Sequence, residues 1–189
     1  MFVEFIIPTY NRINPLKCML ASLIAQTDND WEANVVIDDP EGTDMLNVVK
    51  EFNDPRIKAT FMDKRYNDWG HTPREFGKQM SEAEYIIMTG DDNYYTPNFV
   101  YELKLACDLT NPGMVYWDMV HSHYQYAYFQ CTPAVGQIDM GAFATRNDLA
   151  KQIFLGIRYD ADGWFVHQFT QKFPQETIKK INKVLFVHN

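Results

Sequence analysis

The chain has 189 residues, of which 46% are hydrophobic and 15% aromatic, and its formal net charge is −8. This length is ample for one sizeable hydrophobic core, and the composition excludes a disordered or low-complexity chain. The negative charge argues against a protein that binds nucleic acid non-specifically, because such binding needs a basic face.

The cysteines predict neither a metal site nor disulfides, and the start of the chain does not have the pattern of a signal peptide. Cys18, Cys107 and Cys131 are scattered and form no CxxC pair, so neither a zinc site nor a disulfide framework is predicted, and a reducing compartment is expected. The first residues lack the basic and long apolar stretches of a signal peptide, and no run approaches the ~20 apolar residues that span a bilayer. We therefore expect a cytoplasmic protein without a transmembrane segment, and its oligomeric state stays open.

Strand-like and helix-like patterns alternate along the first 113 residues. Strands are expected at 2–7, 31–37, 56–62 and 84–89. Helices are expected at 14–26, 43–52, 72–81 and from 96 to about 111, where Asn111-Pro112-Gly113 is a stop signal. This βαβαβαβα order predicts an α/β protein with a mostly parallel sheet and helices on both faces.

The remaining residues have a different pattern. Two aromatic strands at 114–120 and 124–131 are expected to pair as a hairpin. A turn is expected at 141–144, helices at 147–154 and 162–173, and a last strand at 183–187. No linker or repeat is evident, so we expect a single domain.

Polar residues follow three of the apolar runs, in FIIPTYNR (5–12), VVIDD (35–39) and MTGDDN (88–93). Such runs read as buried parallel strands, and ligands of open α/β sheets bind beyond the carboxyl ends of the strands. One sheet edge should therefore present Thr9, Asn11, Arg12, Asp38, Asp39, Asp91, Asp92 and Asn93 to a shared cleft. Clustered carboxylates repel one another unless a cation lies among them, so a metal-dependent site for a phosphorylated ligand is predicted.

Six segments, in their order and spacing, resemble family 2 glycosyltransferases with the GT-A fold. They are IIPTYNR, VVIDD, YIIMTGDDNYYTPNF, MGAFATRNDL, YDADGWF and VLFVHN, and the resemblance extends over nearly the whole chain. The resemblance implies inverting, hexosyltransferase-type transfer from a nucleoside-diphosphate sugar, expected to be a UDP-sugar, to a hydroxyl of a carbohydrate or other acceptor. It also implies one GT-A domain over 1–189, with a nucleotide-binding half (1–112) and an acceptor-side half (113–189).

The same resemblance implies an Mn²⁺ or Mg²⁺ cofactor, for which hard carboxylate oxygens are suited. Asp91 and Asp92 occupy the place of the family's DxD-type motif, with Asp92 favoured as the ligand and Asp91 nearer the ribose or the metal's water shell. His188 matches a C-terminal histidine that closes the metal site in many GT-A enzymes. The alternatives are a loop that caps the next helix, and a disordered histidine near the chain end.

The nucleotide is expected to contact residues at the ends of the first strands and in the 64–74 segment. These residues are Pro8, Thr9, Tyr10, Arg12, Asp38, Asp39, Arg65, Arg74 and Asp91. Asp39 matches the family's base-binding position, although Pro40-Glu41-Gly42-Thr43 replaces the usual Gly-Ser pair. The two later arginines suit phosphate or ribose, because arginine binds phosphate in a bidentate manner. Ordinary turns, helix caps and solvated arginines are the alternatives.

An inverting transfer needs a general base for the acceptor hydroxyl, and Asp160 and Asp162 compete for this role. Asp162 fits the family pattern better because an aromatic stretch follows it directly; its alternative role is to cap a helix. Gly141 and Ala142 resemble a small-residue turn where donor and acceptor meet. Trp164 is a candidate for stacking on a sugar, although aromatic residues are more often part of the core.

Two rival functions are considered. A sugar nucleotidyltransferase would favour a glycine-rich, basic signature after the first strand, which PTYNR is not. A nucleotide-sugar-binding module without transferase activity would lose the base and metal positions, for which candidates are present. The donor sugar, the base and the acceptor are not determined by the sequence.

Overall fold

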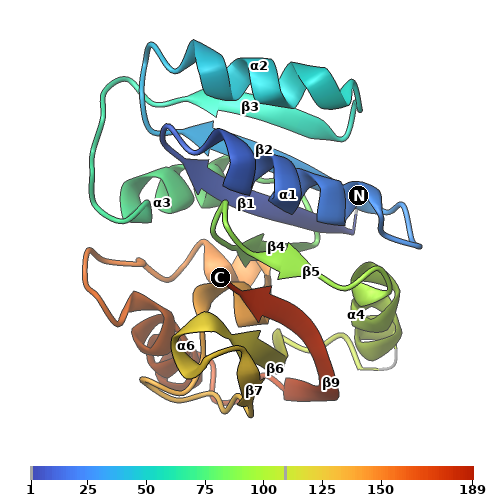
Figure 1. Cartoon of the computed structure of the whole chain (residues 1–189). Coiled ribbons are helices and arrows are strands. Elements are labelled where there is room, and N and C mark those ends of the chain that lie inside the picture. Colours follow the sequence, from blue (N-terminus) through green and yellow to red (C-terminus); the bar gives the residue numbers. More distant parts are fainter. Residues whose placement is uncertain (1, 109) are drawn as a thin grey trace.

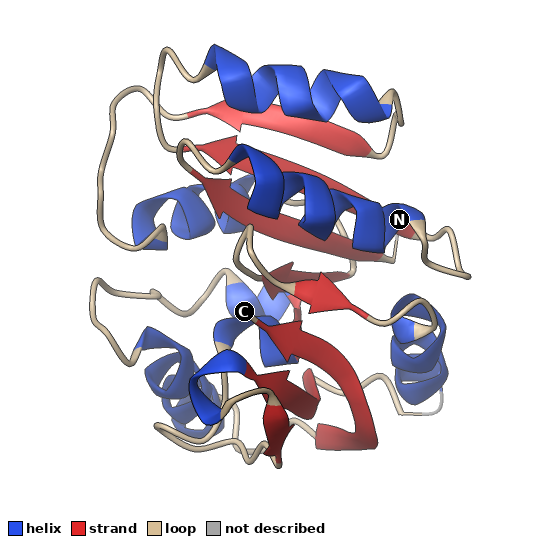
Figure 2. Ribbon diagram, viewed as in Figure 1, coloured by secondary structure: helices blue, strands red, loops and turns tan. Residues whose placement is uncertain are grey.

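The computed structural model describes residues 2–108 and 110–189, which form one mixed sheet with helices packed on it (Figures 1 and 2). The strands are β1 (Val3–Thr9), β2 (Trp31–Ile37), β3 (Ile57–Phe61), β4 (Tyr85–Met88), β5 (Tyr94–Tyr95), β6 (Met114–His121), β7 (Ala127–Phe129), β8 (Phe143–Arg146) and β9 (Ile178–His188). The helices are α1 (Ile13–Ile24), α2 (Thr43–Phe52), α3 (His71–Met80), α4 (Phe99–Asp108), α5 (Asn147–Ala150) and α6 (Ala161–Lys172), with short 3₁₀ helices at Ser122–Tyr124 and Met140–Ala142. The sheet order is β3-β2-β1-β4-β8-β6-β9-β5, and β7 pairs with β6.

The first four expected strands form the parallel part of the sheet, in the order β3-β2-β1-β4. All seven residues of β1 are buried, which explains its nearly continuous apolar sequence. Right-handed crossovers place α1 and α2 on one face and α3 on the other (Figure 1). The chain changes direction across the sheet between β1 and β4, and this is where open α/β sheets bind ligands.

A glycine lets α3 lie close to the sheet. A Cβ atom on Gly77 would lie 2.5 Å from Cγ2 of Ile6 and 3.2 Å from Cγ2 of Val36. A larger residue at this position would require the Ile6 side chain of β1 to shift. The close approach fixes the start of α3 above the carboxyl ends of the same strands.

The second half confirms the expected hairpin and corrects two other expectations. β6 and β7 pair antiparallel, with Met119 opposite Phe129. The predicted turn at 141–144 is wrong from Phe143 onward, because 143–146 is strand β8, which pairs antiparallel with both β4 and β6. The predicted helix at 147–154 is too long: α5 ends at Ala150, and the Ile153 carbonyl accepts a hydrogen bond from the buried Lys78 side chain.

The last strand is longer than predicted and reaches the polar edge of the sheet. β9 runs from Ile178 to His188, parallel to β6 on one side and antiparallel to β5 on the other. The backbone N–H of Asn189 donates to Oδ1 of Asn93 at 3.3 Å. The end of β9 is thereby placed beside the loop that follows β4.

A single hydrophobic core spans the parallel and mixed parts of the sheet. Aromatic rings connect the two parts: Phe5 lies 5.9 Å from Phe99, and Phe99 lies 4.6 Å from Trp117, measured between ring centroids. Trp117 is fully buried, so this member of the aromatic stretch belongs to the core. Burying one such side chain contributes roughly 2–3 kcal/mol. Among the described residues, no helix has the length and apolar character needed to span a membrane.

Candidate functional site

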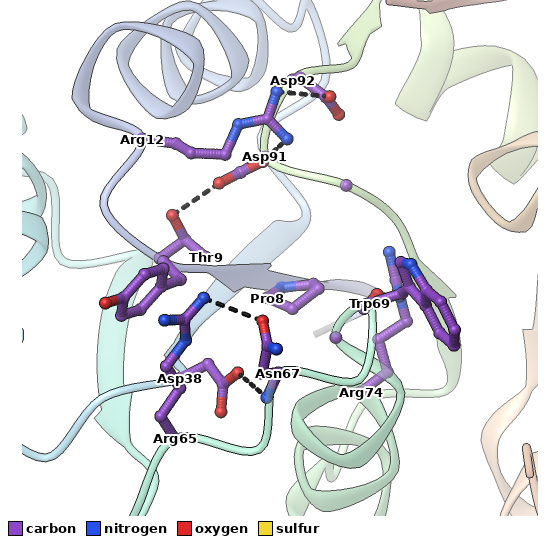
Figure 3. Close-up of a pocket in the computed structure, with 13 residues that line it drawn as sticks. Pro8, Thr9, Arg12, Asp38, Arg65, Asn67, Trp69, Arg74, Asp91 and Asp92 are labelled. Atoms are coloured by element: carbon purple, nitrogen blue, oxygen red, sulfur yellow. Dashed lines mark hydrogen bonds and ion pairs between the residues drawn. The ribbon is translucent and has the colours of Figure 1, made fainter. Parts of the chain in front are cut away.

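A cavity of about 290 Å³ lies at the carboxyl ends of β1, β2 and β4, beneath the segment that leads into α3 (Figure 3). Nine of the predicted site residues line it: Pro8, Thr9, Tyr10, Arg12, Asp38, Arg65, Arg74, Asp91 and Asp92. Asn67, Trp69, Gly70 and Gly90 complete the lining. Gly70 has a φ of +79°, and a Cβ atom there would lie 2.8 Å from the Pro8 ring, so this position requires glycine.

The two aspartates after β2 have different surroundings. Asp38 is 5% exposed, and its carboxylate accepts hydrogen bonds from the backbone N–H groups of Tyr66 (2.8 Å) and Asn67 (3.0 Å). Asp38 therefore holds the segment above the cavity in place. Asp39 lies outside this cavity, in an adjoining hollow of about 240 Å³ that it shares with Tyr10. Its carboxylate accepts from the Glu41 backbone N–H at 2.9 Å.

The two predicted arginines are anchored differently. Arg65 stacks over the Tyr10 ring at 3.6 Å and donates to Oδ1 of Asn67 at 2.9 Å (Figure 3). Arg74 donates to the backbone carbonyls of Thr89 (3.1 Å) and Trp69 (2.8 Å).

The positive charge of Arg74 acts on carboxylates from both halves of the chain. Burial lowers the pKa of Arg74, and Asp139, Asp91, Asp92 and Asp162 oppose that effect. Arginine stays protonated in spite of such a shift, so one fixed positive charge acts electrostatically on these four carboxylates.

Asp91 and Asp92 share the guanidinium group of Arg12. Asp91 accepts a hydrogen bond from the Thr9 hydroxyl at 2.7 Å and lies 3.3 Å from Nη1 of Arg12. Asp92 lies 2.8 Å from Nη2 of the same guanidinium (Figure 3). Burial raises the pKa of Asp91 to about 6, while Thr9 and Arg12 act in the opposite direction. The side chain of Asp91 is 5% exposed and that of Asp92 is 21% exposed, so Asp92 is the more accessible carboxylate.

The acidic pair suits a divalent cation. Its carboxylate oxygens are ligands that Mg²⁺ and Mn²⁺ prefer, and the Arg12 guanidinium shows that a cation is accommodated between the two groups. A Cβ atom on Gly90 would lie 2.8 Å from Oδ1 of Asp92, so the glycine leaves room beside this oxygen. Within 2–108 and 110–189, no three His, Cys, Asp or Glu side chains converge closely enough to hold a metal unaided. A cation here would need further ligands from a bound phosphate or water.

His188 is ordered at the end of β9 rather than loose at the chain end. Its Nε2 lies 3.7 Å from Oδ2 of Asp139, and its Nδ1 lies 3.3 Å from the Ser122 hydroxyl. Its ring stacks on His121 with the centroids 4.0 Å apart. Burial and the neighbouring His188 lower the pKa of His121 to about 4, so His121 is neutral near pH 7. His188 does not line the main cavity.

Asp139 is a carboxylate beside the predicted site residue His188 that the sequence interpretation missed. Its Oδ1 accepts a hydrogen bond from the Gly141 backbone N–H at 2.8 Å, which leaves Oδ2 directed toward His188. The signal for this fixed position was an aspartate two residues before a small-residue turn. Gly141 and Ala142 are themselves buried, and Tyr95 donates its hydroxyl hydrogen to the Gly141 carbonyl at 2.8 Å. The turn therefore places Asp139, and its small residues pack against the core.

The two candidates for the general base are clearly distinguished by their partners. Asp160 pairs with Arg158, which lowers its pKa, and accepts a hydrogen bond from the Trp164 indole N–H at 3.0 Å. Asp162 lies in the first turn of α6 and has no ion-pair partner among the described residues. Burial raises the pKa of Asp162 to about 6, Asp139 and Asp160 add to the effect, and a hydrogen bond from Gly163 opposes it. Asp160, not Asp162, occupies the position before the helix.

The fold and the cavity at the β1–β4 switch point define an α/β protein with a cavity lined by acidic residues and arginines. A family model, "Glycosyl transferase family 2", matches residues 4–126. This match covers more than half of the chain, and the chain therefore belongs to glycosyl transferase family 2.

Two curated proteins match part of the chain. An uncharacterized glycosyltransferase of Haemophilus influenzae is 24% identical over 130 residues, 60% of this chain and 42% of that protein. A putative colanic acid biosynthesis glycosyl transferase, WcaA, of Escherichia coli is 29% identical over 97 residues, 51% of this chain and 34% of that protein. The chain thus matches less than half the length of these relatives.

Solved structures show the same fold. The crystal structure of S. aureus TarS 1-349 superposes with a TM-score of 0.82 at 18% identity, covering 100% of this chain and 60% of that one. Mannosyltransferase PcManGT of Pyrobaculum calidifontis, in complex with GDP-Man and Mn²⁺, gives a TM-score of 0.74 at 15% identity, covering 98% and 56%. The predicted GT-A fold is confirmed by these likenesses.

Proposed function

We propose that this chain transfers a sugar from a nucleoside-diphosphate sugar to an acceptor hydroxyl, with a divalent metal and with inversion at the anomeric carbon. The observation that carries the proposal is the position of Arg74. It lines the cavity with Asp91 and Asp92, and its charge also acts on Asp162 of the second half. The acidic edge proposed for the cation and the carboxylate proposed as the base are therefore both influenced by the charge of one arginine.

The nucleoside is proposed to lie against Tyr10 and Arg65, with Asp38 keeping the covering segment in place and Asp39 toward the base. We favour a UDP-sugar as the donor. TarS has been solved in complex with UDP-GlcNAc and superposes with a TM-score of 0.79 at 16% identity, whereas PcManGT carries GDP-Man. The hexosyl type of the sugar is part of the same proposal.

Arg12 and Arg74 are proposed to bind the diphosphate, because arginine pairs well with phosphate oxygens. Asp92 is the favoured ligand of Mn²⁺ or Mg²⁺, with Asp91 behind it and His188 as a further ligand. When bound, the metal supplies Lewis-acid stabilisation of the charge that develops on the leaving diphosphate. Arg12 would exchange its contact with Asp92 for the diphosphate as the donor binds.

Asp162 is proposed to act as the general base. Its carboxylate takes the proton of the acceptor hydroxyl while that oxygen forms a bond to the anomeric carbon from the opposite side of the leaving group. The bond between the anomeric carbon and the diphosphate oxygen breaks, and its electron pair leaves with the diphosphate. A pKa of about 6 suits this role, because the group is ionised at neutral pH and is still a usable base.

The proposal is tested by thermal unfolding with nucleotides and by measuring nucleoside-diphosphate release from UDP-sugars. A ligand that binds the folded chain raises the unfolding midpoint, so UDP and Mn²⁺ together should raise it more than either alone. Asp92→Asn should remove most of the Mn²⁺-dependent rise of the unfolding midpoint. Asp162→Asn should keep the rise of the unfolding midpoint and lower the rate of nucleoside-diphosphate release at least a hundredfold.

Glu51→Gln is the matched control, because Glu51 forms an exposed pair with Lys17 and lies outside the cavity. It should behave as the unaltered chain does. The absence of a shift with any nucleoside diphosphate would overturn the proposal. A shift without turnover, or with turnover unchanged in Asp162→Asn, would instead favour a binding module or a different base.

A further inference from the structure

We propose that Ser122 and His121 are positioning residues that hold the His188 ring so that its Nε2 atom faces Asp139 and stays available to a metal. This inference rests on the proposed function, in which His188 is a metal ligand. It assigns the ligating nitrogen and the two side chains that keep it available.

The register of two neighbouring strands stacks the rings. β6 and β9 run parallel, and His121 pairs with His188 at their ends, close to the C-terminus marked in Figure 1. The two imidazole rings lie 4.0 Å apart with their planes inclined by 20°. A ring that lies flat against a neighbour cannot tilt without losing that contact.

The His121 ring is itself fixed. Its Nδ1 accepts a hydrogen bond from the backbone N–H of His123 at 3.2 Å. The rings of Tyr124 and Phe129 flank it, with centroids 5.1 Å and 5.9 Å away. His188 therefore stacks on a ring whose orientation is already set by the hairpin between β6 and β7.

Ser122 acts on the tautomer of His188, that is, on which of the two ring nitrogens carries the proton. Its hydroxyl oxygen lies 3.3 Å from Nδ1 of His188 and can accept the proton of a neutral imidazole at that atom. With the proton on Nδ1, Nε2 carries the free lone pair that a metal requires. Such partners of a ligating histidine typically change metal affinity by about 10–100-fold.

The surroundings of Nε2 fit this assignment. Nε2 lies 3.7 Å from Oδ2 of Asp139, which is longer than a hydrogen bond. Oδ1 of Asp139 is held by the Gly141 N–H, and a Cβ on Gly141 would lie 2.5 Å from Phe186, two residues before His188. The carboxylate and the imidazole thus face each other from rigid supports, with Nε2 not committed to Asp139.

The first test is the tautomer of His188 in the metal-free chain, measured by ¹⁵N NMR at about pH 8, where an ordinary imidazole is neutral. We expect the Nδ1-protonated form. Ser122→Ala should shift the population toward the Nε2-protonated form. Ser122→Thr, which keeps the hydroxyl, should show the same Nδ1-protonated form as the unaltered chain. An Nε2-protonated ring in the unaltered chain would overturn the inference.

The second test is Mn²⁺ affinity in the presence of UDP, followed by the EPR signal of free Mn²⁺. Ser122→Ala and His121→Ala should each weaken binding by about tenfold or more. Ser122→Thr and His121→Phe, which keep the hydroxyl and the stacked ring, should stay within about threefold. Thr170→Ala is the hydroxyl control on α6, where the Thr170 hydroxyl donates to the His167 carbonyl, and it should not change the affinity.

The two levels of the proposal fail in different ways. Weaker Mn²⁺ binding in His188→Ala, with unchanged affinity in both Ser122→Ala and His121→Ala, overturns this inference and leaves the proposed function intact. Unchanged affinity in His188→Ala, or no Mn²⁺ binding by the unaltered chain, removes the metal role of His188 itself. Circular dichroism of each variant separates loss of the metal site from loss of the fold.

Discussion

Asp162 stands apart from the other carboxylates at the scale of single residues. Its neighbour Asp160 is neutralised by Arg158, whereas Asp162 is partly buried near Asp139 and forms no ion pair with any described residue. Burial raises the pKa of Asp162 to about 6 from an ordinary value near 4. A carboxylate whose pKa is raised by burial but which is ionised at neutral pH lowers the stability of the folded chain. Such carboxylates are common at functional sites.

Asp162→Asn should therefore stabilise the chain in a pH-dependent way. Between pH about 4 and 6 the folded chain keeps a proton on Asp162 that the unfolded chain has lost, so the free energy of unfolding falls as pH rises through this window. Asparagine does not titrate, and the variant should be more stable by about 1–2 kcal/mol at pH 8, since residual solvent contact reduces the full value.

The measurement is urea unfolding of both chains at several pH values. The difference should vanish below about pH 3, where Asp162 is protonated in both the folded and the unfolded chain. A difference that does not depend on pH would show that the pKa of Asp162 is ordinary in the folded chain.

The connection between α3 and the segment before α6 illustrates stabilisation at the scale of elements. Lys78 of α3 is fully buried, pairs with Glu75 at 2.8 Å and donates to the Ile153 carbonyl. Glu75 also accepts a hydrogen bond from the Leu155 backbone N–H at 3.1 Å. Burial lowers the pKa of Lys78, and Glu75 opposes this. The pair ties the helix that carries Arg74 to the segment that leads to Asp162.

Removing one partner of this pair should be more damaging than removing both. Glu75→Ala leaves the Lys78 ammonium buried without a counterion and should cost about 3 kcal/mol of unfolding free energy. The double variant Glu75→Gln with Lys78→Met removes both charges while keeping volume, and should recover most of that loss.

Urea unfolding measures both variants, with Glu51→Ala as the control. Glu51 pairs with Lys17 on the surface, where loss of an ion pair costs roughly 0–1 kcal/mol. If Glu75→Ala were no more costly than Glu51→Ala, the buried pair would not tie the two elements together.

At the scale of the whole molecule, the two halves share one sheet and one core. β4 of the first half pairs with β8 of the second, and β5 pairs with β9. The predicted division at residue 112 does not separate two structural units, and we expect one domain that unfolds as a unit.

Two buried tryptophans report on the halves separately, Trp31 on β2 and Trp117 on β6. In chains that keep only one of them, with the other tryptophans replaced by phenylalanine, denaturant transitions followed by fluorescence should coincide with the circular dichroism transition of the same chain. Transitions with separate midpoints within one variant would show that the halves unfold independently.

The sequence by itself determined the parallel half and its polar edge. A strand such as β1 is buried on both faces, so its residues form an apolar run that is visible without knowing its partners. The polar residues that end β1 and β4 were placed together because parallel strands end at the same edge. Arg12, Asp91 and Asp92 do meet there.

Only the tertiary structure decided the second half and its contribution to the site. β5 and β8 are short strands that exist because strands distant in the sequence pair with them, and β9 is long because β6 and β5 pair with it on either side. Such pairing is non-local, so a short segment carries little sign of it. For the same reason Asp139 and His188, separated by 49 residues, come within 3.7 Å only through the fold. The sequence predicted the carboxylates at the strand ends, and tertiary packing decided which neighbours tune and orient them.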